Sequence, residues 1–122
     1  MILSTKILGK RGEARAESYL RKSGCNIISR NYRRRFGEID LIYLDAGTLA
    51  FGEVKSRQTY RYGTPSEAVT PQKVRKIIIT ASQFLQENQS FQDAPVRFDI
   101  ICISKQIHWM KGSFNKECLI LD

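Results

Sequence analysis

The stretch "GEIDLIYLDAGTLAFGEVK", residues 37–55, decides the fold. Two apolar, strand-like runs flank "DAG", the strongest hairpin signal in the chain. We expect Asp45 and Thr48 to close a two-residue turn over Ala46 and Gly47. The sequence therefore predicts an antiparallel hairpin whose register is fixed by its turn, although a three-residue turn with a glycine bulge would shift that register by about one residue.

In the two-residue register, Asp40 faces Glu53 and Glu38 faces Lys55. Side chains alternate along a strand, so all four project from one face of the sheet. Facing residues have Cβ atoms about 4.5–5.5 Å apart, and two carboxylates at that separation repel unless a proton or a cation lies between them. Two carboxylates with few other ligands suit Mg²⁺, and a lysine beside the ion can orient or deprotonate a water molecule.

Spacing alone leaves a purely structural alternative open. Glu38 and Lys55 are equally consistent with a cross-strand ion pair, which contributes roughly 0.2–1 kcal/mol. That alternative accounts poorly for Asp40 opposite Glu53, because like charges that face each other are destabilising.

A helix is predicted on the N-terminal side of the hairpin, over residues 9–23, with Gly24 as its stop. Ala16, Tyr19 and Leu20 form its apolar face, and Glu13 shares that face. A carboxylate there is costly unless it is paired. Glu13 is therefore expected either to reach the metal or a metal-bound water, or to sit at the helix edge with its stem packed.

The remaining elements follow from similar patterns. Residues 25–32 read as a strand and 33–37 as a basic turn. Thr70 can cap a second helix that begins at Pro71 and ends near Asn88. Its buried stripe is expected to contain Val74, Ile77, Ile78, Ala81, Phe84 and Leu85.

Two further strands are expected at residues 96–104 and 107–111, an exposed loop at 56–69, and a tail at 117–121 that is ambiguous between strand and helix. The order is helix, three strands, helix, two strands. It predicts one α/β domain spanning residues 1–122, with a mixed central sheet flanked by helices.

Charge indicates a polyanionic partner. The 20 lysines and arginines outnumber 12 acids, which gives a formal net charge of +8. Basic residues flank both ends of the acidic hairpin, as expected for a phosphodiester held over a metal, although a charge run is also an ordinary solvated face. The candidate nucleic-acid-binding residues are Arg33, Arg34, Arg35, Arg57, Arg61, Lys73 and Lys76.

Several classes of protein are disfavoured by composition. There is no apolar stretch of signal-peptide or transmembrane length, so we expect a cytoplasmic protein without membrane contacts. Cys25 and Cys102 lie in apolar stretches that suit reduced core thiols, and with Cys118 they make an odd number. His108 has no nearby cysteine or histidine in the sequence, which argues against a zinc site.

The motifs together resemble a known family. "GEARAESYLRKSG", "RNYRRRFGEIDLI", "FGEVKSR", "YGTPSEAVTPQK" and "RFDII" resemble the bacterial YraN-like family of predicted nucleases. The acid on the first helix, "GEIDLI" and "EVK" resemble the PD-(D/E)xK pattern of the restriction-endonuclease-like superfamily, and the chain is also similar to archaeal Holliday-junction resolvases. The resemblance runs from Gly9 to about Ile103.

This resemblance implies a restriction-endonuclease-like fold and Mg²⁺-dependent hydrolysis of a phosphodiester, with Mn²⁺ as a substitute ion. It implies that Asp40 and Glu53 are metal ligands together with the Val54 carbonyl, that Lys55 positions or activates water, and that Glu13 completes the acidic cluster. The remaining positions that match the family are Arg57, Lys73, Arg97 and Asp99.

Two of these residues have a plainer alternative, since Arg97 and Asp99 share a strand face and suit a structural ion pair. One position departs from the family, because Gly52 stands where a bulkier apolar residue is more usual, so we expect lost packing or a local bulge there.

The sequence thus predicts a metal-dependent nuclease that acts on nucleic acid, with DNA as the first expectation and selectivity for branched structures as a further one. The alternative from another class is a non-catalytic nucleic-acid-binding protein with a vestigial nuclease site. A basic module that binds an acidic protein is a third. Resolvase-like paired cuts would favour a two-fold homodimer, with Ile79 and the tail at 117–121 as candidate contacts.

Overall fold

The computed structural model describes residues 5–56 and 70–114. The predicted order of helix, three strands, helix and two strands is confirmed. In chain order the elements are α1 (Thr5–Lys22), β1 (Asn26–Arg34), β2 (Gly37–Asp45), β3 (Thr48–Ser56), α2 (Pro71–Glu87), the short 3₁₀ helix η2 (Gln89–Phe91), β4 (Val96–Ile103) and β5 (Ile107–Phe114).

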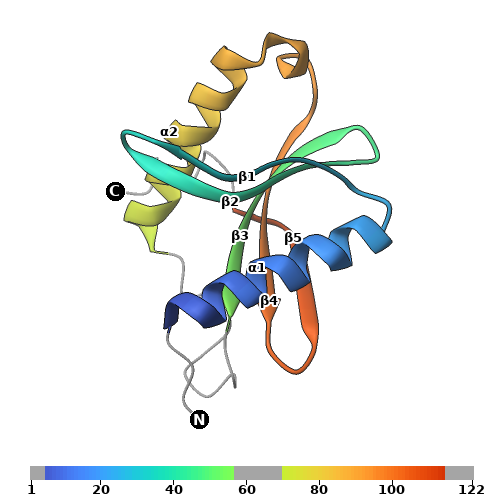
Figure 1. Ribbon diagram of the computed structural model, residues 1–122. Coiled ribbons are helices and arrows are strands. Elements are labelled where there is room, and N and C mark those ends of the chain that lie inside the picture. The colour runs from blue at the N-terminus through green and yellow to red at the C-terminus, as the bar shows by residue number, and fades with distance from the viewer. Residues whose placement is uncertain (1–4, 57–69, 115–122) are drawn as a thin grey trace.

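The strands form one mixed sheet, as predicted, and within it they lie in the order β1-β2-β3-β4-β5. Only β3 and β4 are parallel, because α2 carries the chain back between them, whereas the other neighbours are joined by short turns and run antiparallel. Helix α1 crosses one face of the sheet and α2 packs against the other (Figure 1). Each helix therefore covers its own hydrophobic core.

The hairpin turn between β2 and β3 has the predicted form. Ala46 and Gly47 both have positive φ, 50° and 88°, as in the type I′ turn that matches strand twist. Asp45 pairs with Thr48, and the same register continues without a bulge to Leu41 opposite Gly52.

Beyond that last pair, β2 and β3 diverge. Strand β3 continues alongside β4 as far as Ser56 opposite Ile103, whereas β2 continues only with β1. The expected facing pairs of Asp40 with Glu53 and Glu38 with Lys55 are therefore wrong as ladder positions. The place where the two strands separate is called the fork below, and the candidate site lies there.

Helix α2 begins and ends as its sequence indicates, whereas α1 ends as predicted but begins at Thr5, before the predicted start at residue 9. The Thr70 hydroxyl accepts a hydrogen bond from the Lys73 N–H at 3.2 Å and caps α2, with Pro71 in its first turn. Gly24, with a φ of 94°, terminates α1, and the Cys25 N–H donates to the Leu20 carbonyl at 2.9 Å in a Schellman-type closure.

Some boundaries and burial assignments differ from expectation. Strand β1 continues to Arg34, so the turn is confined to Arg35 and Phe36. Tyr19 is 36% exposed and contacts the edge of Trp109, whereas Ala16 and Leu20 are buried as predicted. Thr80 joins the buried stripe of α2, because its hydroxyl donates to the Lys76 carbonyl at 2.7 Å and so needs no water.

Gly52 leaves no gap in the core, so the expected loss of packing is wrong. A Cβ at this position would lie 3.0 Å from Tyr43 Cε1 and 2.9 Å from Ile101 Cδ1. The Tyr43 ring fills the space that a larger side chain would need, and the β3 register runs through Gly52 without a bulge.

We expect Gly52→Val to reduce the free energy of unfolding by about 1–3 kcal/mol, since the added methyl groups would overlap Tyr43 and Ile101. Urea denaturation monitored by circular dichroism measures this. Unchanged or greater stability of the variant would show that the Tyr43 ring can move aside.

Candidate active site

The fork opens beside the N-terminal turns of α2. A hollow of about 230 Å³ lies there, lined by Gly37, Glu38, Asp40, Glu53, Lys73, Lys76 and Ile77. Three of the lining residues are acids and two are lysines. The structure thus brings together in one hollow the two carboxylates singled out from the hairpin and two of the basic residues expected to hold nucleic acid.

Asp40 marks the position where β2 leaves β3. Its Oδ2 accepts a hydrogen bond from the Val54 N–H at 2.8 Å, so a side chain satisfies the backbone that the departing strand no longer pairs. Burial raises the pKa of Asp40 to about 7, and the charges of Glu53, Glu13 and Glu38 add to the shift against the opposing hydrogen bond from Val54. The ionised form of Asp40 is therefore disfavoured in the folded protein.

Glu53 lies on the same face of β3 as the core residue Phe51 and is only 6% exposed. Two ammonium groups approach its Oε1 atom, Lys73 Nζ at 2.6 Å and Lys55 Nζ at 3.5 Å. Burial and the adjacent Lys73 lower the pKa of Lys55, while Glu53 opposes that shift. A lysine with a lowered pKa is better able to take a proton from water.

Glu13 approaches the fork from α1, on the other side of the sheet. Burial raises the pKa of Glu13, with contributions from the charges of Glu38 and Glu53, and a side-chain hydrogen bond with Asn31 opposes the shift. The expectation that Glu13 belongs to the acidic cluster is consistent with this proximity.

Asn31 is a site neighbour that was not predicted. It has a φ of 50° within β1, a left-handed conformation that asparagine tolerates better than most residues. An asparagine inside a strand pattern, just before "YRRR", was the available signal.

Neutralising Asp40 should stabilise the protein. A carboxyl whose folded-state pKa rises from 3.8 to about 7 contributes stability below pH 4 that is lost as the pH rises through 7. We therefore expect Asp40→Asn, measured in EDTA, to unfold with a free energy about 1–3 kcal/mol higher than wild type at pH 8, because one pKa unit corresponds to about 1.4 kcal/mol.

The gain should shrink when the same urea titration is made near pH 4.5. Asp93→Asn is the matched control, since Asp93 is an exposed aspartate on the connection before β4. A less stable Asp40→Asn protein at pH 8 would mean that Asp40 is already compensated.

The protein atoms at the fork supply only some of the ligands that a small, hard cation needs. Among the described residues, no group of three or more His, Cys, Asp or Glu side chains is close enough to hold a metal ion. Asp40 and Glu53 instead form a two-carboxylate set in which burial and the neighbouring acids raise the pKa of Asp40. Mg²⁺ suits such a set, because it binds one or two carboxylates and retains water or phosphate oxygens.

The Val54 carbonyl is consistent with its expected place in that set. A residue in a strand directs its N–H and C=O toward the same neighbouring strand. Since the Val54 N–H donates to Asp40, the Val54 carbonyl points into the fork as well.

The arginine run does not form one uniform surface. Arg34 is held by Glu87 through two hydrogen bonds, from Nε at 2.9 Å and from one NH2 at 2.6 Å, and stacks on Tyr32. Arg33 pairs with Glu38 at 3.2 Å, which replaces the expected partnership of Glu38 with Lys55. Arg35 lies over the exposed Phe36 ring.

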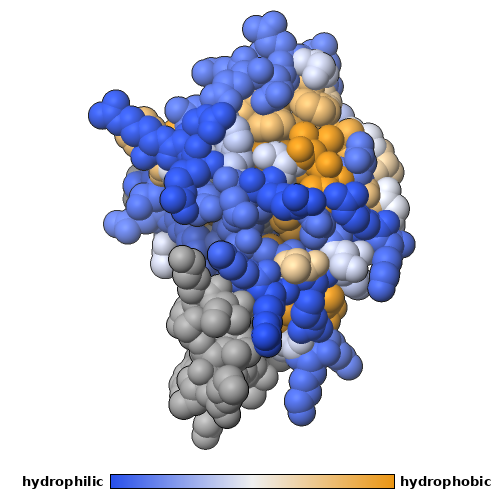
Figure 2. Space-filling model, in the orientation of Figure 1, coloured by the Kyte–Doolittle hydropathy of each residue, from blue (hydrophilic) through white to orange (hydrophobic). Residues whose placement is uncertain are grey.

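Hydrophilic side chains cover most of the face that α1 and the β1–β2 hairpin present (Figure 2). Arg33, Arg35 and Lys76 are exposed near the fork and available to a polyanion. Arg34 is better described as a structural residue, and Arg57 and Arg61 lie outside the described residues.

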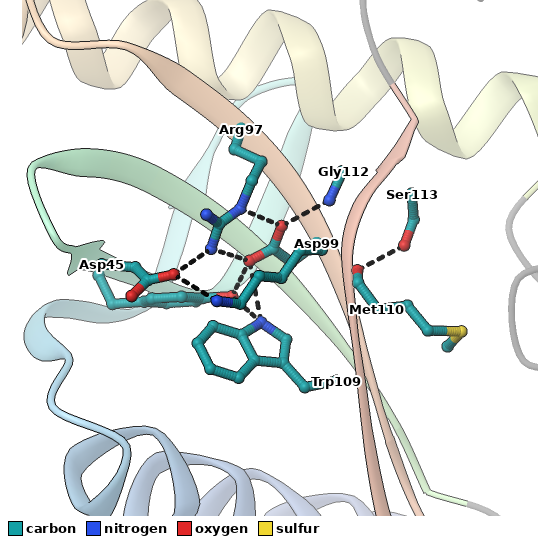
Figure 3. A network of polar contacts seen from close by, with 9 residues as sticks. Asp45, Arg97, Asp99, Trp109, Met110, Gly112 and Ser113 are labelled. Atoms are coloured by element: carbon teal, nitrogen blue, oxygen red, sulfur yellow. Dashed lines mark hydrogen bonds and ion pairs between the residues drawn. The ribbon is translucent and has the colours of Figure 1, made fainter.

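Arg97 and Asp99 form a structural network away from the hollow. Asp99 projects from β4 toward the α1 face, next to Tyr43, whereas Glu53 projects toward α2. Arg97 donates to Asp99 at 2.8 and 2.9 Å and to Asp45 at 2.9 Å (Figure 3). The ion pair expected between Arg97 and Asp99 is therefore present.

The fold and the site define a class: a mixed α/β domain with two carboxylates at a strand fork, one of which is buried and contacts two lysines, and with exposed basic residues nearby. The chain belongs to the uncharacterised protein family UPF0102, whose family model matches residues 12–103. This confirms the resemblance to the YraN-like family at the level of the family.

Relatives match over most of their own length. A UPF0102 protein of Persephonella marina is 47% identical over 110 residues, covering 89% of this chain and 94% of the relative. One from Methylobacillus flagellatus is 43% identical over 114 residues, covering 90% and 98%. One from Vibrio parahaemolyticus is 34% identical over 118 residues, covering 94% and 98%. None of the helices described is long and apolar enough to cross a membrane.

Proposed function

We propose that this protein is a divalent-metal-dependent nuclease that hydrolyses phosphodiester bonds of DNA, with branched DNA as the preferred substrate. The observation that carries the proposal is the pairing at the fork of a half-buried carboxylate, Asp40, with a buried one, Glu53, whose Oε1 lies 3.5 Å from Lys55 Nζ. Two carboxylates that line one hollow and are largely shielded from water cost stability, and a role in binding a cation accounts for their being kept together.

Asp40, Glu53 and the Val54 carbonyl would hold Mg²⁺, or Mn²⁺ in its place. When bound, such an ion supplies positive charge to the phosphoryl oxygens and lowers the pKa of water. The remaining chemistry is assigned to side chains of the chain itself.

Lys55 is the residue that handles the attacking water. Its side chain is only 20% exposed, and burial favours the neutral amine that accepts a proton. Once protonated, the same ammonium stabilises charge that builds on the phosphorus oxygens. Glu13, with a raised pKa, would orient a second water at the α1 side of the fork.

The rim residues bind the phosphate backbone. Arg33 and Arg35 lie at the β1–β2 turn, and Lys76 lies one helical turn after Lys73 on α2. With a net charge of +8, their contribution should be sequence-independent and should weaken as salt rises. Arg57 and Arg61 extend this proposal to residues outside the described part of the chain.

Paired cutting of a branched substrate would require a two-fold dimer. Ile79, expected as one contact, is 44% exposed on α2 and so is available to a second copy. The other expected contact, the tail at 117–121, lies outside the described residues.

Cleavage of duplex, branched and single-stranded DNA, each with Mg²⁺, with Mn²⁺ and with EDTA, tests the proposal. We expect cleavage that EDTA abolishes and that Asp40→Asn reduces by at least about 10²-fold, with Asp93→Asn unchanged. Salt-sensitive binding without turnover of any substrate, unaffected by EDTA or by Asp40→Asn, would favour the non-catalytic nucleic-acid-binding alternative.

A further inference from the structure

The nearer of the two lysines on Glu53 is not the lysine of the "EVK" motif. Lys73 Nζ lies 2.6 Å from Glu53 Oε1, and Lys55 Nζ lies 3.5 Å from the same atom. The Lys73 side chain is 39% exposed, whereas that of Glu53 is 8% exposed. Lys73 thus reaches from the surface to a carboxylate at the floor of the hollow.

The position of Lys73 on α2 makes this contact informative. Lys73 belongs to the first turn of α2, which contains no acidic residue. The partial positive charge of a helix N-terminus disfavours a cation there, so α2 itself does not favour an ammonium at this point. The buried Glu53 carboxylate supplies the compensation, and Lys73 in turn neutralises a charge that would be costly to bury alone.

We infer that Lys73 is an exchangeable counter-ion of the carboxylate site: it pairs with Glu53 when no divalent ion is bound and leaves Glu53 when a divalent ion takes the same oxygen. This inference rests on the proposed metal site. The ammonium and a divalent ion repel each other, and at 2.6 Å the ammonium occupies the approach to Oε1. After its release, the Lys73 ammonium still lines the hollow with Lys76, where phosphate oxygens of the substrate would arrive.

Competition of this kind has a measurable consequence. A divalent ion binds only the fraction of molecules in which Glu53 is free, so pairing with Lys73 weakens the apparent affinity by that fraction. Removing the Lys73 charge should therefore tighten metal binding. A purely structural role for Lys73, in which it holds Glu53 in position for the metal, predicts the opposite change.

Mn²⁺ titration of the full chain without DNA, followed by electron paramagnetic resonance, tests the exchange. We expect Lys73→Met to bind Mn²⁺ about five- to tenfold more tightly than wild type. Lys76→Met is the matched control, because it removes the same charge from the same hollow without a direct contact to Glu53, and it should change the affinity less than about twofold.

A second measurement uses wild-type protein and so does not depend on how the variants fold. Lysine acylation at pH 8, quantified by mass spectrometry, should modify Lys73 several-fold faster with saturating Mg²⁺ than with EDTA, while Lys76 changes little. Mn²⁺ binding to Lys73→Met that is no tighter than to Lys76→Met, or Lys73 acylation unaffected by Mg²⁺, would overturn the exchange while leaving the metal site standing. Failure of wild type and both variants to bind Mn²⁺ would overturn the inference and the proposed function together.

Discussion

Replacing Lys55 by methionine is expected to lower metal-dependent DNA cleavage by about 10²–10⁴-fold, the range for loss of a positioned acid–base group. Methionine keeps the apolar stem that packs beside Glu53 but offers no amine to take the proton of the attacking water. Glu53 retains its closer partner, Lys73 at 2.6 Å, so the fold should survive the change. Single-turnover cleavage with saturating Mg²⁺ measures the effect.

The control for Lys55 is Lys105→Met, because Lys105 is exposed in the turn between β4 and β5, away from the hollow. Its cleavage rate should equal that of wild type. Mn²⁺ affinity of the Lys55→Met protein should not fall below that of wild type, because Asp40 and Glu53 remain, and this separates chemistry from metal binding. Cleavage by Lys55→Met within threefold of wild type would remove Lys55 from the reaction.

Asp99→Asn is expected to lower the free energy of unfolding by about 3–5 kcal/mol, the usual consequence of breaking a buried ion pair from one side. Asp99 is fully buried. Its two oxygens accept hydrogen bonds from five donor atoms: Tyr43 Oη, Trp109 Nε1, Arg97 Nε and one Arg97 NH2, and the Gly112 N–H. An asparagine would turn an NH2 group toward these donors and leave Arg97 with Asp45 as its remaining charge partner.

Urea denaturation at pH 7 measures this loss, with Asp93→Asn as the exposed control. Burial by itself would raise the pKa of Asp99, but the hydrogen bonds from Arg97, Tyr43, Gly112 and Trp109 outweigh burial and hold the pKa below its usual value. The contribution of Asp99 is therefore present above pH 4 and is lost as the pH falls through its lowered pKa. A loss of under 1 kcal/mol would mean that the network adds little to stability.

The same substitution, aspartate to asparagine, is thus expected to have opposite effects on stability at the buried Asp99 and the half-buried Asp40. At Asp99 the surrounding donors favour the carboxylate, whereas at Asp40 burial and the neighbouring acids oppose it. An uncompensated carboxylate that stability alone would not keep is characteristic of a functional residue. This contrast separates the candidate site from the structural network without reference to any relative.

The hairpin, the start and end of α2 and the end of α1 followed from local chemistry, whereas the start of α1 did not. Ala46 and Gly47 specify a two-residue turn, Thr70 and Pro71 start α2, and Gly24 ends α1. Each signal depends on the backbone conformation of a few consecutive residues, so the local sequence is sufficient to predict these turns and helix ends.

The fork did not follow from local sequence, because it depends on a strand that comes later in the chain. Beyond Gly52, β3 pairs with β4, and α2 lies between these two strands in the sequence. Counting residues outward from the turn therefore predicts a longer β2–β3 ladder than the structure has, and it pairs Asp40 directly with Glu53. Both acids nevertheless line one hollow, since the separation occurs at that point.

Long basic side chains were the least predictable part of the site. Arg33, Arg34 and Arg35 are equivalent in the sequence, but only Arg34 reaches Glu87 at the end of α2. The sequence predicts that Lys73 contacts a phosphate of the nucleic acid. Its contact with Glu53 is not predicted, because that contact depends on how α2 docks beside the fork. Tertiary packing, which no local pattern encodes, decides these partners.

The central claim is that Asp40 and Glu53 bind a divalent ion together, and a crystal structure of the protein soaked in Mn²⁺ tests it most directly. An anomalous difference peak within coordination distance of an oxygen of each carboxylate is the predicted result. Ordered Asp40 and Glu53 side chains with no anomalous peak between them, at a Mn²⁺ concentration that supports DNA cleavage, would contradict it.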